Sequence, residues 1–268
     1  MGTTAEFDAA WERANADPSI AQTEWAAALP LARAGFRVDP DLWLMRMRMA
    51  VSKLEDIATS PEIRVASEEA VHEILAYGRA GADSDPQRRD LLVTMLNSHS
   101  MRLESEGRLE ESLAIASEQR DLAEADAVAA PADGRTASIL QHARDRLAEL
   151  RLATGDAVGA LEIADALVAT SRANGEDPSQ APSGLPAWLE LRARALAAVG
   201  DVAQARAEFE TALEWKRARV RTGRFFLAHL DLAEALDEYA AMLRGMGDEA
   251  DALAAEQDAE RVRVEKTA

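Results

Sequence analysis

Apolar residues recur at intervals of three and four along almost the whole chain. This spacing places them on one face of an α-helix, whereas a half-buried strand would alternate apolar and polar positions. No run of alternating residues is long enough to predict a strand. The pattern therefore predicts an all-α fold.

Helix-breaking residues divide this pattern into segments of helix length. The breaks lie at Asp17-Pro18, Thr59-Ser60-Pro61, Gly107, Gly155-Asp156, Gly200-Asp201 and Gly247-Asp248. Successive breaks are separated by 42 to 48 residues, counted from positions 17, 59, 107, 155, 200 and 247. A regular recurrence on this scale is typical of helical repeat arrays. It predicts six helix pairs, each joined by one short turn.

The last four breaks share a local pattern around their glycine. Glycine ends a helix in a left-handed conformation that other residues resist, and the aspartate that follows in three of the four turns can cap the next helix. Small residues also recur at two fixed distances from each glycine, which allows the two helices of a hairpin to approach closely. These residues are Ser100, Ala148, Ala193 and Ala240 before the turn, and Ser112, Ala160, Ala205 and Ala252 after it.

These four segments resemble tetratricopeptide repeats (TPRs), with the turn glycine at the fifteenth position of the repeat and the small residues at the eighth and twentieth. The segment from Trp188 to Leu213 is the most similar, because it also has Phe209 and Ala212 at the family's aromatic and small positions. The period exceeds the family's usual length of about 34 residues. Such extended repeats are similar to those of kinesin light chains and of arrays attached to bacterial regulators. The resemblance implies a right-handed α-solenoid of about six antiparallel helix hairpins.

The resemblance covers only part of the chain. We expect four extended TPR-like repeats with a C-terminal capping helix over residues 87–268, and TPR-like hairpins assigned by turn spacing alone over residues 1–86. Together they are expected to form one continuous solenoid. Two longer loops are predicted at Ala127–Thr136 and Asn174–Pro186, and Pro30 is expected to kink or split the helix Ser19–Gly35.

In arrays of this family the first helices of successive pairs line a concave groove that binds extended peptides or partner helices. The family's inward positions can be transferred to each of the four repeats. They give Thr94, Asn97, Ser98, Met101, His142, Asp145, Arg146, Glu149, Glu190, Arg194 and Asp237, together with Ala187, Leu191, Glu234, Glu238 and Ala241. This mixture of charges favours a peptide with some basic character. The alternative is that these residues form only a solvated face.

Composition narrows the range of partners. The chain has 268 residues, no cysteine and a net charge of −18, so we exclude disulfides and cysteine-ligated metals and expect neither nucleic acid nor an anionic membrane as partner. The absence of a long apolar run and of a signal peptide predicts a cytoplasmic location. A composition rich in alanine and arginine indicates a GC-rich bacterial source.

One basic segment interrupts the acidic chain between Glu214 and Asp231. Three of its side chains, Arg217, Arg221 and Arg224, share a helix face and form a candidate docking patch for an acidic segment, a phosphate or another subunit. The alternative is that these basic residues only complement the dipole at the end of a helix.

We find no catalytic motif, phosphate-binding loop or dinucleotide fingerprint, and we expect no cofactor and no metal. Glu69 and His72 have the spacing of one half of a di-iron site, but no second half accompanies them. The sequence therefore favours a non-catalytic scaffold, adaptor or sensor module that binds a protein or peptide. Two hypotheses remain beside it: an all-α enzyme or small-molecule-binding protein with a pocket inside the superhelix, and a self-assembling homo-oligomer.

Overall fold

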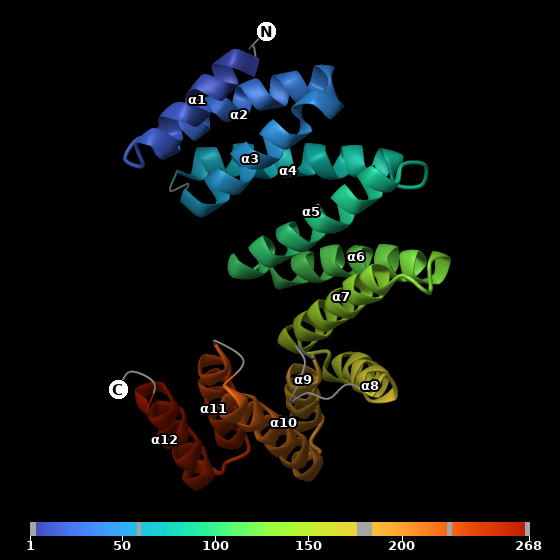
Figure 1. The fold of residues 1–268 in the computed structure, drawn as a ribbon, viewed down its shortest axis with the longest axis vertical. Coiled ribbons are helices and arrows are strands. Elements are labelled where there is room, and N and C mark those ends of the chain that lie inside the picture. The colour runs from blue at the N-terminus through green and yellow to red at the C-terminus, as the bar shows by residue number, and fades with distance from the viewer. Residues whose placement is uncertain (1–3, 58–59, 176–183, 224–226, 266–268) are drawn as a thin grey trace. The chain divides into compact units, whose positions relative to one another are not determined.

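The computed structural model describes residues 4–57, 60–175, 184–223 and 227–265. Within these ranges every regular element is a helix and there is no strand (Figure 1). In chain order the helices are α1 (Thr4–Ala16), α2 (Ala21–Val38), α3 (Pro40–Ile57), α4 (Pro61–Gly81), α5 (Pro86–Ser105), α6 (Leu109–Ala129), α7 (Gly134–Ala153), α8 (Ala157–Ala173), α9 (Leu185–Ala198), α10 (Val202–Thr222), α11 (Ala228–Gly245) and α12 (Glu249–Glu265). The predicted all-α class is confirmed.

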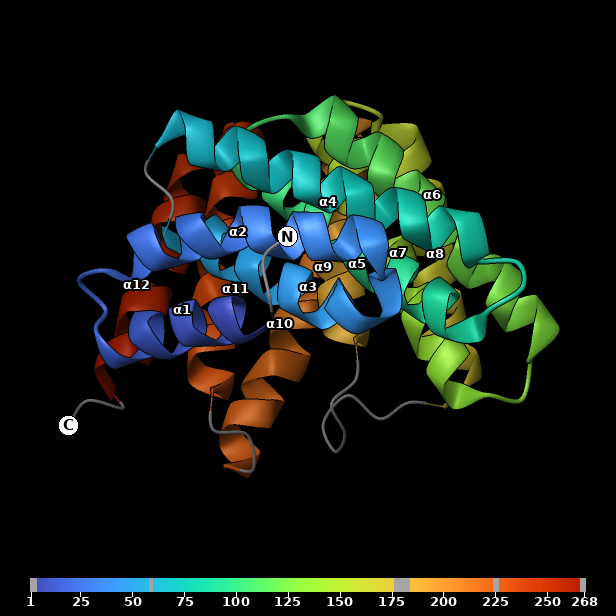
Figure 2. The same cartoon turned by 90° about the horizontal axis from the view of Figure 1, so that it is seen from above.

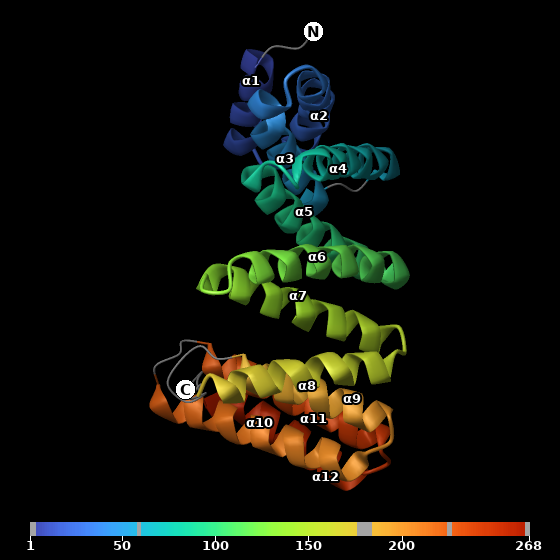
Figure 3. The same cartoon turned by 90° about the vertical axis from the view of Figure 1, so that its right-hand side faces the viewer.

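The chain forms two compact units, Met1–Arg102 and Leu103–Ala268. Helices α1 to α4 and most of α5 belong to the first unit, and α6 to α12 belong to the second. Within each unit, most helices that follow one another in the chain pack against each other. Figure 3 shows α6, α7 and α8 as antiparallel neighbours. The predicted series of helix hairpins is confirmed. One continuous solenoid over residues 1–86 and 87–268 stays a prediction.

The four turn glycines have the backbone conformation that the sequence predicts. Their φ angles are 76°, 89°, 93° and 84° for Gly107, Gly155, Gly200 and Gly247. In each turn the residue after the glycine donates its N–H to the carbonyl five residues earlier, as from Asp201 to Leu196 at 2.9 Å. This bond is the signature of a Schellman motif, which satisfies carbonyl groups left over at a helix end. The same motif therefore ends α5, α7, α9 and α11.

Aspartate caps begin three of the helices that follow these turns. The carboxylates of Asp156, Asp201 and Asp248 accept backbone N–H groups from the next turn at 2.9, 3.2 and 3.3 Å. Each bond satisfies a donor that has no partner within its helix. The caps fix where α8, α10 and α12 begin.

The small residues at the two repeated positions are all buried. All eight side chains are at most 1% exposed, namely Ser100, Ala148, Ala193, Ala240, Ser112, Ala160, Ala205 and Ala252. Side chains of this size allow close contact between helix backbones. The prediction that alanine forms the small-residue half of each hairpin is confirmed.

Aromatic side chains fill the core of the first unit. Phe7 contacts both Trp25 and Trp43, with ring centroids 6.2 Å apart in each pair and edge-to-face geometry. Gly35 allows α2 and α3 to meet, because a Cβ atom built there would lie 2.1 Å from the Trp43 ring. Figure 2 shows that α2 and α4 also lie side by side. The second helices of the first two hairpins are therefore in contact in this unit.

The second unit has smaller, mostly aliphatic cores around α6 to α8 and an aromatic core near its end. Leu147 and Leu150 pack with Ala116 in the first region. Phe209 and Tyr239 pack with ring centroids 5.0 Å apart in the second.

One boundary prediction is wrong and two are partly tested. Helix α2 continues through Pro30, so it is not split, and buried residues lie on both sides of the proline. A kink at Pro30 stays a prediction. The predicted loop Ala127–Thr136 is too long: α6 continues to Ala129, and Asp133 caps α7 by accepting the N–H of Arg135 at 2.9 Å. In the predicted loop Asn174–Pro186, residues 176–183 lie outside the described part, while Leu185 and Pro186 begin α9.

Candidate functional site

The first helices of three successive hairpins lie next to one another in the second unit. Helix α7 contacts α9, and α9 contacts α11. In a curved array of helix pairs, the helices on the inner side lie closer together than those on the outer side. Contact between every second helix is therefore easier on the inner side. The three first helices of this unit therefore lie side by side, and their role as the concave face of a groove stays a prediction.

A groove of about 490 Å³ lies on these three helices, and we call it the first-helix groove. Its lining combines two charged residues with apolar and small ones: Leu152 from α7, Arg194 and Ala197 from α9, Glu238, Ala241, Met242 and Gly245 from α11, and Met246 just after α11. Ala197, Ala241 and Gly245 leave space, and methionine side chains adapt to different apolar shapes. The groove can receive an apolar side chain beside a charged pair.

Arg194 carries the positive charge of this groove. Its guanidinium binds the carboxylate of Glu149 on α7, and its Nε atom lies 3.8 Å from Oε2 of Glu238 on α11. Burial would lower the pKa of Arg194, but Glu149 and Glu238 hold it above its usual value. One arginine thus connects all three helices and fixes two carboxylates at the edge of the groove.

Asp145 lies one turn before Glu149 on α7. Burial, assisted by the negative charge of Glu149, raises the pKa of Asp145 to about 6, while His142 and Arg194 oppose this shift. Near neutral pH the carboxyl group can therefore exchange its proton.

A buried ion cluster lies one turn before Arg194 on α9. Lys216 on α10 is 5% exposed, and its Nζ atom lies 3.0 Å from Oε1 of Glu190 and 2.7 Å from Oδ1 of Asp231. Burial raises the pKa of Glu190 to about 7, although Lys216 partly offsets this effect. Burial would also lower the pKa of Lys216, but its two carboxylate partners keep it raised. This cluster joins α9, α10 and α11 from within.

The structure brings some of the predicted groove residues together and separates others. Asp145, Glu149 and Arg194 form one charged group. His142 is exposed and uses Nδ1 in a 2.8 Å contact with the carbonyl of Ser138, one turn earlier on its own helix. Two other predicted side chains bind elsewhere: Arg146 pairs with Glu104, and Asp237 with Arg263.

The predicted residues on α5 belong to the first unit. Thr94 and Ser98 are exposed, and their hydroxyl groups donate to carbonyls of α5 at 2.9 and 3.3 Å. The side-chain amide of Asn97 lies 3.7 Å from the sulfur of Met101, which is 54% exposed. These four residues form one accessible stripe, and their role as a binding surface stays a prediction.

The side chains of the predicted basic patch do not all lie in the same environment. Arg217 pairs with Asp258 on α12, with Nη2 and Oδ2 2.9 Å apart. Arg221 is exposed on the last turn of α10. Arg224 lies outside the described residues. The neighbouring Lys216 points into the core instead of joining the patch.

Metal and membrane sites have no support in the described part of the chain. No group of three or more metal-ligating side chains is present there. His72 packs edge to face on His99, with ring centroids 5.5 Å apart, rather than beside a second carboxylate motif. No helix in the same ranges combines the length and hydrophobicity that crossing a bilayer requires.

The sequence pattern missed the apolar end of the first-helix groove. Leu152, Ala197, Met242, Gly245 and Met246 follow the predicted positions by one or two helical turns. Their signal is present in the sequence, since each continues the spacing of three and four residues from Glu149, Arg194 or Glu238. The transferred positions stop short of these turns.

Comparison with known proteins supports the fold. No family model matches the sequence, and no curated protein is similar to it. Among solved structures, BtubC (BKLC) from P. vanneervenii has a TM-score of 0.63 at 17% identity, over 92% of this chain and 91% of that one. Two structures of a kinesin light chain protein from Podosopora anserina, with nearly identical TPR-like repeats, have TM-scores of 0.56 and 0.54 at 15% identity, over 81% of this chain and 92% of theirs. The chain therefore has the fold of TPR-like repeat proteins.

Proposed function

We propose that the protein is a non-catalytic scaffold or adaptor that binds a segment of a partner protein in the first-helix groove. The observation that carries this proposal is the groove itself, in which three first helices combine an apolar end with the Arg194 group. TPR-like repeats commonly serve as protein-interaction scaffolds. A cytoplasmic location and a bacterial source remain part of the same proposal.

The chemistry of the groove favours a particular kind of segment. Glu238 lines the groove, and Asp145 and Glu149 lie beside it, so three carboxyl groups surround the single Arg194. The segment should therefore carry positive charge near α7 and α9, and an apolar side chain near Met242 and Met246. An extended peptide and a helix both satisfy these requirements.

A groove-filling substitution tests the proposal. A peptide array covering the proteome of the source organism, probed with the full chain, would supply candidate segments whose affinity is then measured by fluorescence anisotropy. Ala241→Trp places a large ring in the groove and should reduce affinity at least tenfold, because the apolar end no longer accepts a side chain. Ala203→Trp, on the exposed start of α10, is the matched control and should bind normally. Equal affinity for both variants would place binding outside the groove.

A second candidate is a small-molecule-binding protein or enzyme that uses the same surface. The observation in its favour is the pair of carboxyl groups whose pKa values are raised, to about 6 for Asp145 and about 7 for Glu190, because such shifts occur often at functional sites. Thermal melting across a metabolite panel separates the two ideas. Stabilisation by small metabolites and by no peptide would favour the second candidate.

A further inference from the structure

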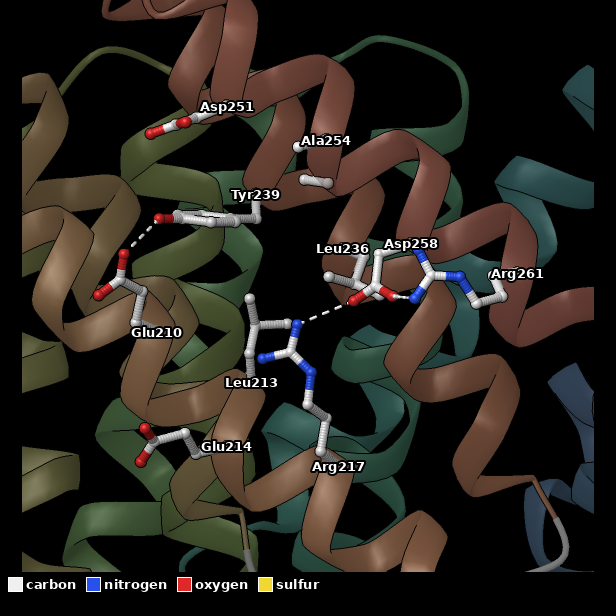
Figure 4. Close-up of a pocket in the computed structure, with 11 residues that line it drawn as sticks. Glu210, Leu213, Glu214, Arg217, Leu236, Tyr239, Asp251, Ala254, Asp258 and Arg261 are labelled. Carbon is white, nitrogen blue, oxygen red and sulfur yellow. Dashed lines mark hydrogen bonds and ion pairs between the residues drawn. The ribbon is translucent and has the colours of Figure 1, made fainter.

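A second groove of about 480 Å³ lies between the second helices α10 and α12, over α11, and we call it the α10–α12 groove (Figure 4). Its lining residues on α10 and α12 recur at helical spacing, so one face of each helix forms a wall. The lining consists of Glu210, Leu213, Glu214 and Arg217 from α10, Leu236 and Tyr239 from α11, and Asp251, Ala254, Ala255, Asp258 and Arg261 from α12.

Ion pairs join α10 to the chain of α12 toward both ends of this groove. Arg206 binds Asp248 and also Asp251, the latter with Nη1 and Oδ2 2.6 Å apart. At the other end Nη2 of Arg217 lies 2.9 Å from Oδ2 of Asp258, as Figure 4 shows. Residue numbers rise in the same direction along both walls, so α10 and α12 run parallel. The two arginines are about 16 Å apart along α10, at 1.5 Å per residue, which limits the opening to a short segment.

The middle of the groove is apolar and has small side chains on one wall. Leu213 and Leu236 lie at its base beside the ring of Tyr239. Opposite them, α12 contributes only Ala254, which is exposed, and Ala255. A wall of two alanines leaves space that a large apolar side chain can fill. The binding free energy gained is proportional to the apolar area that this side chain removes from water.

The rim around this space is acidic. Glu210 accepts a 2.9 Å hydrogen bond from the hydroxyl group of Tyr239, which holds its carboxylate at the edge of the groove. Glu214 is exposed one turn further along α10 and forms no ion pair with another residue in the described ranges. The basic side chains Arg217 and Arg261 are both engaged by Asp258. The open middle therefore offers negative charge without a bound counter-ion.

We propose that the α10–α12 groove binds a segment of a partner protein in which a large apolar side chain is adjacent to a lysine or arginine. The apolar side chain fills the space between Leu213 and Ala254, and the cation reaches Glu214 and Glu210. Charge complementarity selects this occupant over an acidic one, and the net charge of −18 adds long-range attraction for basic segments. This surface belongs to the second helices and is separate from the first-helix groove.

Binding of synthetic peptides to the full, ¹⁵N-labelled chain tests this proposal. The probe is a capped octapeptide with one Trp between two Lys in a Gly/Ser background; its controls replace Lys by Glu or Trp by Ala. The Lys-Trp probe should shift the amide signals of Leu213, Ala254 and Ala255, and each control peptide should bind at least fivefold more weakly. Shifts confined to other helices, or equal binding of the Glu-Trp peptide, would overturn the proposal.

Matched variants then locate the ionic contact and the apolar contact of the probe. Glu214→Gln should weaken the Lys-Trp probe about two- to fivefold, the range for an exposed ion pair, whereas Glu162→Gln on the exposed face of α8 should leave it unchanged. Glu214→Lys should reverse the preference toward the Glu-Trp peptide. Ala254→Trp should abolish binding while the helical circular dichroism remains. If Glu214→Lys keeps the wild-type preference, the groove does not select a cation and the proposal fails.

Discussion

Lys216 and Glu190 form an ion pair in which both residues are almost fully enclosed, with Nζ and Oε1 3.0 Å apart and side-chain exposures of 6% and 8%. Both charges have left water, so each depends on the other for compensation. Asp231 is the second partner of Lys216 and is 43% exposed. The pair therefore contributes to the alignment of α9 and α10 as long as both members are present.

Removing the lysine alone should destabilise the protein strongly. We expect Lys216→Met to lower the free energy of unfolding by about 3 kcal/mol at pH 8, because Glu190 then lies buried without its positive partner and must either stay charged or take up a proton above its usual pH range. Urea unfolding monitored by circular dichroism measures the change. Arg221→Met, at an exposed position on the same helix, is the control and should lie within about 0.5 kcal/mol of wild type.

The double variant distinguishes charge compensation from packing. Lys216→Met combined with Glu190→Gln removes the uncompensated charge and should recover part of the lost stability. If the double variant is as unstable as Lys216→Met alone, the loss comes from the shape of the lysine side chain.

Stability should fall as pH rises toward neutrality, and Glu190 should account for much of the decrease. Its pKa is raised to about 7 in the folded protein from the ordinary glutamate value of 4.5, so the folded state binds the proton more tightly than the unfolded state. Between these two values the folded state holds more protons, and deprotonation costs stability as pH increases. Asp145 acts in the same direction, with a pKa of about 6.

Urea unfolding at pH 5 and pH 8 measures this effect. The stability of Glu190→Gln relative to wild type should increase between the two pH values by about 2 kcal/mol, since each pKa unit corresponds to about 1.4 kcal/mol. Glu162→Gln, an exposed carboxylate replaced in the same way, should show no such trend. A parallel pH profile for wild type and Glu190→Gln would contradict the raised pKa.

The turn glycines should not tolerate a side chain. Gly200 has φ of 93°, where an L-residue is strained, so Gly200→Ala should cost about 1 kcal/mol. A Cβ atom at this position meets nothing within 4 Å, so the cost reflects backbone conformation and not a clash. Gly134→Ala also meets nothing but lacks a positive φ, and thermal unfolding should show it to be neutral or stabilising.

Enlarging a repeated small residue should separate two helices. Ala148 on α7 is 0% exposed, and Ala148→Leu should destabilise by about 1 to 3 kcal/mol through overpacking. Ala153→Leu adds the same atoms to an exposed position of the same helix and should change stability little. Chemical unfolding of both variants tests whether close contact at this position, rather than leucine itself, causes the loss.

The hairpin architecture could be predicted from the sequence because its determinants are local. Gly155 and Asp156 end one helix and begin the next through bonds within a few residues of each other, so their chemistry is visible in a short stretch of sequence. Pro30 marks a limit of the same local reasoning, because α2 continues through it although proline removes one hydrogen bond.

The candidate site was only partly predictable because its contacts join different helices. The pairing of Arg194 with Glu149 and Glu238 depends on how α7, α9 and α11 are rotated about their axes. Helical periodicity places Lys216 on the face opposite some of its basic neighbours but does not reveal that Glu190 lies across from it. The basic segment therefore looked more uniform in the sequence than it is in the structure.

The order of helix contacts in the second unit also has a consequence for folding. From α6 to α12, each helix packs chiefly against the helices before and after it in the chain, and the turns that join most of these pairs are only a few residues long. Forming each contact thus closes a short loop and loses little chain entropy. Low contact order of this kind accompanies folding within microseconds to milliseconds. A nucleus such as the Phe209 and Tyr239 contact can grow by adding one neighbouring helix at a time.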